Sequence, residues 1–579
     1  MDTLQESSSS PAAWPAVSLK DCAAQLCASG QRFEMEEIDI RGISTRVWKN
    51  VPPSLAQLAR IARTYDQRIF SVYEDERVSY EAWYRATATL AAKLSALGIK
   101  KGDRVALAMK NLPEWPVAYF AIVSLGAVIV PLNVWWTVPE LSYGLSDSGV
   151  KALICDSERY ECLQPHLAQL PDIKHIIASR SSAQLSAGEH HLESIIGSPN
   201  DYSKLEPIEI PDIDIIPEDN AAIFYTSGTT GKPKGAIVSH RNIVTNIFSS
   251  VYFASCAALR RGEEVPEPVQ KVSLMVIPLF HVTACNAGLM GALFYGHTLV
   301  FMPKWDTVKA FEIIEREKVT GTGGVPTIAW QLLEHPERNN YDLSSIEAIS
   351  YGGAPAAPDL VQKVKDEFGA LPATGWGMTE TSATVTQFSS EDYLNRPDSC
   401  GPAVPVADIK IMSTDGKREL AAEEVGELWV RGPQVIKGYW NNPKGTKETF
   451  IDGWVRTGDL ARMDEERFCY IVGRTKDVII RGGENIYPVE VENVLYDHPA
   501  VTDAALLGIA HRTLGEEPAA VVHLAPGQQA TEEELKLWVR ERLAIFKTPV
   551  KILFSEQTLP RNANGKIMKA QLQSLFNDE

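Results

Sequence analysis

The sequence predicts an α/β protein with a large N-terminal domain of mixed, mostly parallel sheets, a small β-barrel-like part and a small C-terminal α/β domain. Three observations lead to this prediction. Short apolar strand-like stretches such as "GAVIVPLN" and "KALICD" alternate with helix-period stretches through most of the chain, which is typical of βαβ units and parallel sheets. After about Gly426, short β-rich pieces with glycine turns follow one another. From Lys476 a compact α/β pattern begins.

We expect residues 1–50 to form a disordered or poorly ordered tail and a lead-in segment, because "MDTLQESSSSPAAWP" is acidic and rich in serine. This start also lacks the basic and apolar regions of a signal peptide. The large domain is expected over residues 51–475, in which residues 79–97 have a helical period.

The most apolar run, residues 117–136, reads "VAYFAIVSLGAVIVPLNVWW" and is long enough to raise the question of a membrane. Gly126 and Pro131 interrupt this run. We therefore expect a buried helix, a turn and a buried strand here, and no integral membrane span.

Residues 476–579 are expected to form the small domain. Their pattern predicts a helix over 489–496, strands over 501–509 and 519–524, and a second helix over 532–543. Thr531 and Glu534 have the spacing of a capping box at the start of that second helix.

Composition narrows the classes of function. Of the 579 residues, 45% are hydrophobic and 22% are charged, so the chain can bury a large core without disulfides or metals. The net charge of −18 repels nucleic-acid phosphates, and we expect no nucleic-acid partner. The eight cysteines show no C-x-x-C spacing, which disfavours zinc and redox sites and suits a reducing, cytoplasmic location.

The stretch Tyr225–Gly235, "YTSGTTGKPKG", brings glycines, hydroxyl residues and lysines close together. It is not a Walker A loop, because Gly228 and Gly231 are too close and Pro233 stands where Ser or Thr would bind magnesium. Both flanks are strand-like, so we expect a loop between two strands and a helix only from about Arg241.

The same stretch has the chemistry of a phosphate-binding loop. Hydroxyl and ammonium groups donate to phosphate oxygens, and glycines allow the backbone to approach closely. The alternative is a solvated surface turn, since clusters of Gly, Ser and Thr are usually loops. The candidate phosphate-binding residues are Thr226, Ser227, Gly228, Thr229, Thr230, Gly231, Lys232 and Lys234.

This stretch is similar to the signature of the adenylate-forming (AMP-binding) superfamily, and later motifs resemble that family in the same order. They are "YGGAPAAP" (351–358), "GWGMTET" (375–381), "GELWVRGP" (426–433), "GWVRTGDL" (453–460), "GRTKDVIIRGGENIYPVEVE" (473–492) and "LPRNANGKI" (559–567). The resemblance favours the acyl-CoA synthetase branch and implies ATP, Mg²⁺ and coenzyme A. In the implied reaction a carboxylate attacks ATP to give acyl-AMP and pyrophosphate, and a thiol then attacks acyl-AMP.

The resemblance implies roles for individual residues. Lys566 follows the tight-turn signal Asn564-Gly565 and matches the family's catalytic lysine, whereas by itself it would be interpreted as a solvated surface lysine. Glu380 resembles the magnesium carboxylate, with Thr226 as a second metal ligand, and Thr379 resembles a phosphate contact. By itself, Glu380 would be interpreted as a surface acid.

A second set of residues is implied to hold the nucleoside. Asp459 resembles the acceptor for the ribose hydroxyls and Arg474 a second ribose contact, although such a pair is otherwise an ordinary surface salt bridge. Trp376 stands where many relatives have tyrosine; it can stack on adenine but lacks the hydroxyl. The residues implied around the base are Gly353, Ala354, Pro355, Gly375, Trp376 and Gly377.

The resemblance also implies a mobile small domain that rotates between the two half-reactions. Lys476 matches the hinge position in "GRTK", and hinges absorb backbone rotation at the ends of elements. Gly482 and Gly483 resemble the loop that lines the channel for the pantetheine arm of coenzyme A. A plain hairpin turn is the alternative for these glycines, and both interpretations can hold.

The acid is expected to be hydrophobic. His281 in "PLFHVTA" resembles the pocket histidine of acyl and aryl CoA ligases, or is a buried core histidine; His240 is either a cleft residue or a helix-start contact. No Asp stands where amino-acid-activating relatives pair the substrate ammonium. Apolar stretches such as "VTACNAGLMGALF" favour a fatty or aryl acid. Cys285 occupies the place of a gating tryptophan of some long-chain relatives, so medium-chain and bulky acids remain open.

Coenzyme A is the expected thiol, because residues 459–473 are too short to contain the insertion of ligases that load carrier proteins. An acyl-AMP ligase of that kind and a luciferase-like adenylating oxygenase stay as alternatives. An inactive relative is disfavoured because Lys566, Glu380 and Asp459 are intact. A homodimer is left open.

Overall fold

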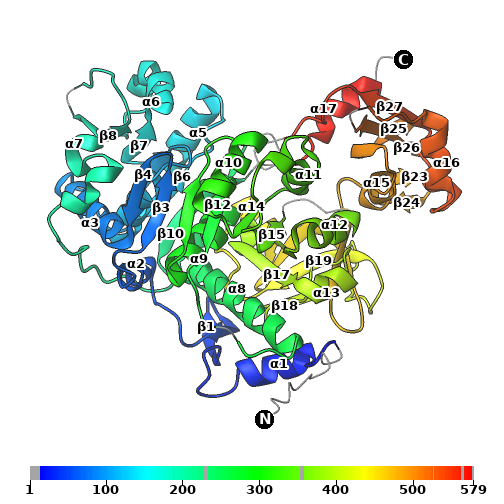
Figure 1. Ribbon diagram of the computed structural model, residues 1–579, viewed down its shortest axis with the longest axis horizontal. Helices are drawn as coiled ribbons and strands as arrows, with labels where there is room; N and C mark the ends of the chain where they lie inside the picture. Colours follow the sequence, from blue (N-terminus) through cyan, green and yellow to red (C-terminus); the bar gives the residue numbers. More distant parts are fainter. Residues whose placement is uncertain are drawn as a thin grey trace, which may run out of the picture.

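The computed structural model describes residues 14–576 except 187, 227–231, 266, 353–357, 526 and 562–565. A lobe built on the N-terminal half and a small C-terminal domain lie at opposite ends of the molecule in Figure 1, and two further sheets lie between them. The predicted fold class is confirmed: mixed sheets with helices form a large N-terminal domain, and a small α/β domain follows.

In the described part of the chain, seven strands form the first sheet, which is parallel apart from one antiparallel hairpin at its edge. In spatial order the strands are β11 (Lys234–Ser239), β10 (Asn220–Thr226), β6 (Val128–Pro131), β5 (Arg104–Ala108), β7 (Ala152–Asp156), β8 (His175–Ser179) and β9 (Glu189–His191). The helices of this part are α2 (Leu55–Arg63), α3 (Tyr80–Ala96), α4 (Glu114–Ser124), α5 (Val138–Ser148), α6 (Ser157–Leu163) and α7 (Glu193–Ile196).

Eight of the described strands form the second sheet, which is parallel in its centre and antiparallel at both edges. Their order is β17 (Ala383–Ser389), β16 (Leu371–Met378), β15 (Ala348–Tyr351), β14 (Gly321–Gly324), β12 (Val272–Met275), β13 (Thr298–Phe301), β3 (Ile69–Tyr73) and β4 (Glu76–Ser79). Its helices are α8 (His240–Arg260), the π-helix η3 (Thr283–Leu289), α9 (Met290–Tyr295), α10 (Thr307–Glu317), α11 (Pro326–Glu334), α12 (Pro358–Phe368) and α13 (Ser390–Asn395).

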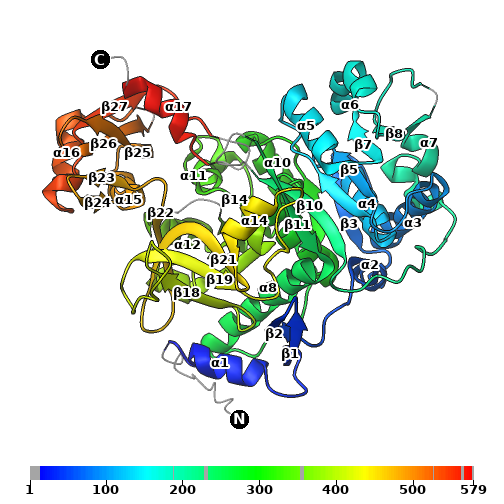
Figure 2. The ribbon, with the colours of Figure 1, turned by 180° about the vertical axis from the view of Figure 1, so that it is seen from behind.

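The β-rich part predicted after Gly426 belongs to an antiparallel sheet whose first strand precedes Gly426; this sheet is seen most clearly in Figure 2. Its described strands are β18 (Asp408–Met412), β19 (Gly426–Arg431), β20 (Phe450–Ile451), β21 (Trp454–Met463) and β22 (Cys469–Arg474), with α14 (Pro443–Thr449) beside them. It corresponds to the predicted barrel-like part, but in the described residues it is an open sheet of strand order β18-β19-β21-β20, with β22 added on β21.

The small domain begins a new sheet after β22. Its described elements are β23 (Ile479–Arg481), β24 (Glu484–Ile486), α15 (Pro488–Tyr496), β25 (Val501–His511), β26 (Gly515–Leu524), α16 (Glu532–Arg540), β27 (Lys551–Ser555) and α17 (Lys569–Gln573). The predicted helices and strands are all present, although α16 ends three residues before the predicted limit. The capping box is present, since Glu534 N donates to Thr531 Oγ1 at 3.2 Å and Glu534 Oε2 accepts from Thr531 N at 2.8 Å.

Residues 14–50, within the expected tail and lead-in segment, contain α1 (Leu19–Leu26) and the hairpin of β1 (Met35–Ile40) and β2 (Ile43–Trp48). Phe33 and Trp48 pack against the ring of Tyr252 on α8, with ring centroids 5.6 and 5.8 Å apart. Arg41, in the turn of the hairpin, donates to the carbonyl oxygens of Val435 and Ile436. This segment is therefore packed against the large domain.

The apolar run predicted as helix, turn and strand forms α4 and β6, and both are buried. Among the described helices, α8 alone is long and apolar enough to cross a membrane by length and composition. In the protein, 78% of the apolar window of α8 is buried against its neighbours, so core packing accounts for its composition.

Candidate active site

The phosphate-loop stretch joins two antiparallel strands, as predicted. Thr226 at the end of β10 pairs with Lys234 at the start of β11, and α8 begins only at His240. The Nζ of Lys234 lies 5.0 Å from the ring centroid of Tyr439, and the Nζ of Lys232 lies 5.3 Å from that of Tyr143. Two ammonium groups thus stand at the base of the loop. The loop residues Ser227, Gly228, Thr229, Thr230 and Gly231 lie outside the described residues.

Glu380 lies in a short 3₁₀ turn, η5 (Thr379–Thr381), between β16 and β17. Only 7% of Glu380 is exposed, and burial raises the pKa of its carboxyl above the usual range while Tyr439 and Lys234 oppose the rise. The hydroxyl of Tyr439 donates to Glu380 Oε1 at 2.5 Å, and the Ile436 N–H donates to the Glu380 carbonyl oxygen at 3.0 Å. Glu380 is therefore a held, buried carboxyl and not the exposed acid of the alternative interpretation.

Asp459 on β21, Arg474 on β22 and Trp376 on β16 meet. Cross-strand register between β21 and β22 places Arg474 opposite Asp459, and Arg474 Nε lies 2.9 Å from Asp459 Oδ1. Trp376 Nε1 donates to Asp459 Oδ2 at 2.9 Å. Burial raises the pKa of Asp459, and the Arg474 guanidinium opposes this rise. Both carboxylate oxygens have a donor, so the pair is not an ordinary surface salt bridge.

Lys566 approaches this group from the small domain. It is partly buried, and burial together with the Arg474 guanidinium lowers the pKa of Lys566, while Asp477 and Asp459 oppose this shift. The charges of Asp459 and Arg474, in the large domain, thus act on the ammonium of Lys566, in the small domain. The surrounding residues 562–565, and the base-contact candidates Gly353, Ala354 and Pro355, lie outside the described residues.

The remaining glycine candidates of the nucleotide site are tightly packed. A Cβ on Gly375 would lie 2.6 Å from the Thr386 carbonyl oxygen, and one on Gly377 would lie 1.6 Å from the Ala383 carbonyl oxygen. Antiparallel pairing of β16 with β17 brings these backbones together. Both positions therefore need glycine for close backbone approach.

Lys476 and the two glycines after it lie at the start of the small domain. Lys476 is exposed in the turn between β22 and β23. Gly482 and Gly483 form the two-residue loop between β23 and β24, with φ of 59° and 93°. Two positive φ angles are what a tight hairpin requires, and glycine adopts them readily. The hairpin interpretation of the glycines thus describes their backbone.

His281 lies two residues before the π-helix η3, next to the stretch expected to line the acid pocket. It is partly buried, and desolvation lowers its pKa to about 4, so the imidazole is neutral at pH 7. Cys285 on η3 is fully buried beside Tyr119, and Trp135 packs edge-on against Phe280 with ring centroids 5.4 Å apart. Short π-helical segments often occur at functional sites.

His240 belongs to the helix start and not to an open cleft. It is fully buried, and its Nδ1 accepts from the Leu55 N–H at 3.2 Å. Desolvation lowers the pKa of His240 to about 4. Of the two interpretations of His240, the structure supports the helix-start contact.

Some side chains that hold the site were not identified from the sequence. Tyr439 donates directly to Glu380, and Arg41 supports Glu380 indirectly by donating to Ile436. Two asparagines, Asn286 and Asn246, contact the backbone at the end of the turn that carries Glu380. They belong to segments far apart in the chain, so no local motif marks them. The replacement of tyrosine by Trp376 was the one visible signal, since its N–H is the donor to Asp459.

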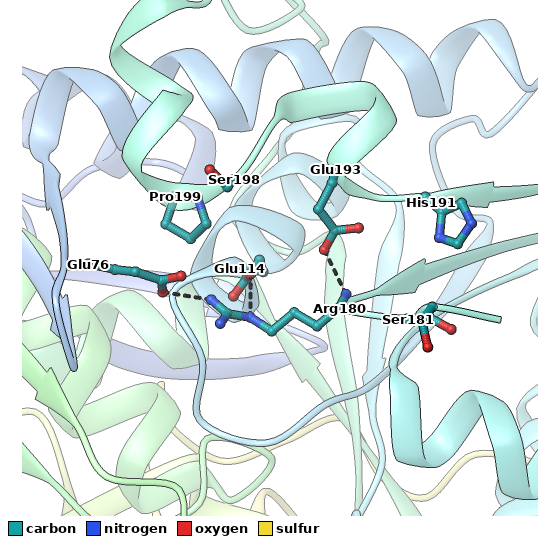
Figure 3. A pocket seen from close by; sticks show the side chains of 9 residues that line it. Glu76, Glu114, Arg180, Ser181, His191, Glu193, Ser198 and Pro199 are labelled. Carbon is teal, nitrogen blue, oxygen red and sulfur yellow. Dashed lines mark hydrogen bonds and ion pairs between the residues drawn. The ribbon is translucent and has the colours of Figure 1, made fainter.

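A cavity of about 490 Å³ lies elsewhere, beside the first sheet (Figure 3). The guanidinium of Arg180 in this cavity donates to Glu114 at 2.8 Å and to Glu76 at 2.6 Å. The backbone N–H of Arg180 donates to the carboxylate of Glu193. None of the sequence-predicted site residues that the structure describes lines it. Arg180, Glu76 and Glu114 are paired with one another, so we assign these three residues a structural role.

The chain matches two family models. The model described as "AMP-binding enzyme" covers residues 58–440, and "AMP-binding enzyme C-terminal domain" covers residues 490–566. The chain belongs to the AMP-binding enzyme family. The family resemblance drawn from the motifs is therefore confirmed.

Relatives of this AMP-binding enzyme include acyl-CoA ligases. A long-chain-fatty-acid–CoA ligase of Bacillus subtilis (strain 168) is 35% identical over 529 residues, 88% of this chain and 92% of that protein. A feruloyl-CoA synthase of an Amycolatopsis species is 34% identical over 499 residues, 86% of this chain and 94% of that protein. The o-succinylbenzoate CoA synthetase of Bacillus subtilis, solved with its acyl-adenylate, has a TM-score of 0.73 at 31% identity and covers 90% of this chain and 98% of that one.

Proposed function

We propose that this AMP-forming acid–CoA ligase activates a hydrophobic carboxylic acid with ATP, releases pyrophosphate and passes the acyl group from acyl-AMP to the thiol of coenzyme A. The observation that carries the proposal is the position of Lys566, within electrostatic reach of Asp459 and Arg474. A cation there opposes the repulsion between an incoming carboxylate and the α-phosphate, which is the main barrier of this step.

We propose that the β- and γ-phosphates lie against the loop between β10 and β11. Thr226, Lys232 and Lys234 supply donors at its base, and the loop residues outside the described part would complete it. Thr379 would contact phosphate from the neighbouring turn. Because the strand β11 follows the loop and α8 begins only at His240, we propose that side chains and backbone amides supply the positive charge for the phosphates.

The part of the candidate site around Glu380 and Thr226 has the chemistry of a magnesium site. The carboxylate of Glu380 and the hydroxyl of Thr226 are oxygen donors of the kind Mg²⁺ prefers, and both adjoin Lys234. Magnesium bound there would neutralise phosphate charge. Tyr439 keeps the Glu380 carboxylate oriented by its 2.5 Å bond to Oε1, and that bond favours the ionised form that a metal needs.

The nucleoside would lie between Asp459 and β16. Asp459 would accept from the ribose hydroxyls, and Arg474 would be the second ribose contact. Gly375, Trp376 and Gly377, together with Gly353, Ala354 and Pro355, would surround the base. Trp376 then has two tasks, since its N–H holds Asp459 while its ring adjoins the base.

For the second half-reaction we propose rotation of the small domain about Lys476. The exposed turn between two sheets is a place where backbone rotation disturbs few contacts. The Gly482-Gly483 loop, with no side chains, would then border the pantetheine arm. Coenzyme A is thus the proposed thiol.

We propose that the acid lies against η3, with neutral His281 at the carboxylate end. Cys285 is buried where some long-chain relatives are expected to have a gating tryptophan, so the proposed acids are medium- or long-chain fatty acids or bulky, aryl acids. The relatives act on acids of both kinds, as the fatty-acid–CoA ligase and the feruloyl-CoA synthase show by name. A cytoplasmic location and a homodimer are further parts of the proposal.

A panel of carboxylic acids tests this function. Each acid is incubated with the enzyme, ATP and Mg²⁺, and pyrophosphate release is measured first without and then with coenzyme A. The expected result is acid-dependent release together with a CoA thioester identified by mass. Release of pyrophosphate with no thioester would indicate a carrier-protein acceptor, and no release with any acid would overturn the proposal.

A further inference from the structure

The turn that carries Thr379 and Glu380 is strained. Ser382 has a φ of 56° and Ala383 a φ of 121°, a region that residues with side chains rarely adopt. The Ala383 carbonyl also stands directly against Gly377, where no side chain could fit. Such a backbone persists only where surrounding contacts hold it in place.

Two buried asparagines hold this turn through hydrogen bonds. Asn286 on η3 donates through Nδ2 to the carbonyl oxygen and to the hydroxyl of Ser382, both at 3.1 Å. Asn246 on α8 accepts from the Thr384 N–H at 2.7 Å and donates to the Thr381 carbonyl oxygen at 3.4 Å. The strained backbone is thus fixed on both sides of Ser382.

Packing alone does not explain an asparagine at position 286. The residue is 0% exposed, and among the described residues its Oδ1 has no hydrogen-bond partner. A buried amide oxygen without a partner destabilises a protein, and an apolar side chain of similar size would avoid that loss. The two hydrogen bonds from Asn286 Nδ2 to Ser382 are the interactions that an apolar side chain at this position could not make.

We propose that Asn286 is a positioning residue that keeps the Glu380 carboxylate in place for the metal-bound nucleotide, an inference that rests on the proposed role of Glu380. Asn286 belongs to the helix expected to line the acid pocket, and Ser382 directly follows the turn η5 that carries Glu380. One buried side chain therefore links the acid side of the site to its metal side.

Calorimetric binding of ATP, without acid, tests the proposal. Asn286→Leu keeps the volume and removes the donor. Because supporting partners of metal ligands typically change metal affinity by ten- to a hundredfold, we expect the Kd of MgATP to rise about tenfold, while the Kd of ATP in EDTA stays within about twofold. The rate of pyrophosphate release should fall, with little change in the KM of the acid.

Asn111→Leu is the matched control. Asn111 is a buried asparagine that uses both ends of its amide, donating to the Ile277 carbonyl at 2.9 Å and accepting from the Leu279 N–H at 2.8 Å, away from the Glu380 turn. Its replacement should lower the Tm more than Asn286→Leu does, because two backbone groups lose their partners. It should leave the ratio of the two ATP dissociation constants unchanged.

A second variant asks whether the strained turn is the point of action. Glycine adopts a φ of 56° without strain, so Asn286→Leu combined with Ser382→Gly should recover part of the MgATP affinity. If Asn286→Leu does not fold, Asn286→Ser, which retains a hydroxyl donor, takes its place and should show a smaller loss.

Equal changes in the two Kd values for Asn286→Leu, or no change in either, would overturn the proposal. A wild-type enzyme that binds MgATP but forms no acyl-AMP from any acid would instead overturn the proposed function. The ratio of the two Kd values is measured without turnover, so it reports on Asn286 in either case.

Discussion

The turn at Glu380 and the hairpin loop at Gly482-Gly483 belong to the same proposed site, but the protein holds them in opposite ways. Glu380 is buried and fixed by Tyr439 and by the Ile436 N–H, and the two asparagines hold the backbone after it. The glycine loop is exposed at the edge of a small sheet. Apart from Lys566, the groups proposed for nucleotide activation are thus built into the large domain, whereas those proposed for the thiol belong to the small domain, whose rotation is part of the proposal.

Lys566 combines features of both regions. It belongs to the small domain, yet its electrostatic partners Asp459 and Arg474 belong to the large one. This arrangement is the one that the proposed first half-reaction requires, with the Lys566 cation at the α-phosphate. The comparison therefore predicts that substitutions in the two regions separate the two half-reactions.

Lys566→Ala should give the largest separation. Loss of a charge aimed at the developing negative charge typically lowers rates by about 100- to 1,000-fold, and we expect a loss of that size in acyl-AMP formation. Attack of coenzyme A on supplied acyl-AMP should be largely retained. Pyrophosphate release and thioester formation from synthetic acyl-AMP measure the two steps, and equal loss in both would refute the role of Lys566.

Tyr439→Phe should act on the fixed region through pH. Burial raises the pKa of Glu380 and the Tyr439 hydroxyl opposes that rise, so its removal raises the pKa further. A metal ligand must be ionised, so the acid limb of the rate of pyrophosphate release should move to higher pH. A hydrogen bond to a charged group contributes about 1.5–3 kcal/mol. At pH values below the acid limb of the wild-type enzyme, we therefore expect the rate of pyrophosphate release to fall at least about tenfold. An unshifted limb would contradict this account.

Trp376→Phe should have a smaller effect. It removes the N–H donor to Asp459 but keeps an aromatic ring for the base. A single hydrogen bond contributes about 1 kcal/mol, so the KM for ATP should rise about fivefold with a smaller change in the rate. Trp376→Tyr is the control, since its phenol hydroxyl is a hydrogen-bond donor on an aromatic ring, which phenylalanine lacks. If both variants lose the same amount, then the donor to Asp459 is not what matters.

Local patterns in the sequence were sufficient for the fold and for much of the candidate site. The period of residues 79–97 predicts α3, and the interrupted apolar run predicts α4 and β6, because each pattern reflects burial of one continuous segment. The strand flanks of the phosphate loop follow from the same reasoning. Resemblance of motifs supplied Glu380, Asp459 and Lys566.

What could not be predicted depends on contacts between distant segments. Tyr439 reaches Glu380 across 59 positions of sequence, and Asn286 reaches Ser382 across 96. Neither residue type is unusual in its own segment, and only the folded sheets bring the partners together. The composition of α8 alone also does not distinguish a buried core helix from a membrane-spanning helix. The burial of α8 in the folded protein accounts for its apolar composition.

Gly483→Ala should have the smallest effect and decides between the two interpretations of the glycine loop. There is open space for a Cβ at this position, so the added strain comes from the φ of 93° alone and should destabilise the small domain by about 1 kcal/mol. If the loop borders the thiol channel, the KM for coenzyme A should also rise several-fold while pyrophosphate release is unchanged. Thr531→Ala, which removes the cap of α16 in the same domain, should destabilise by about the same amount and leave that KM unchanged. An identical response of the two variants would mean that Gly483 only closes a hairpin.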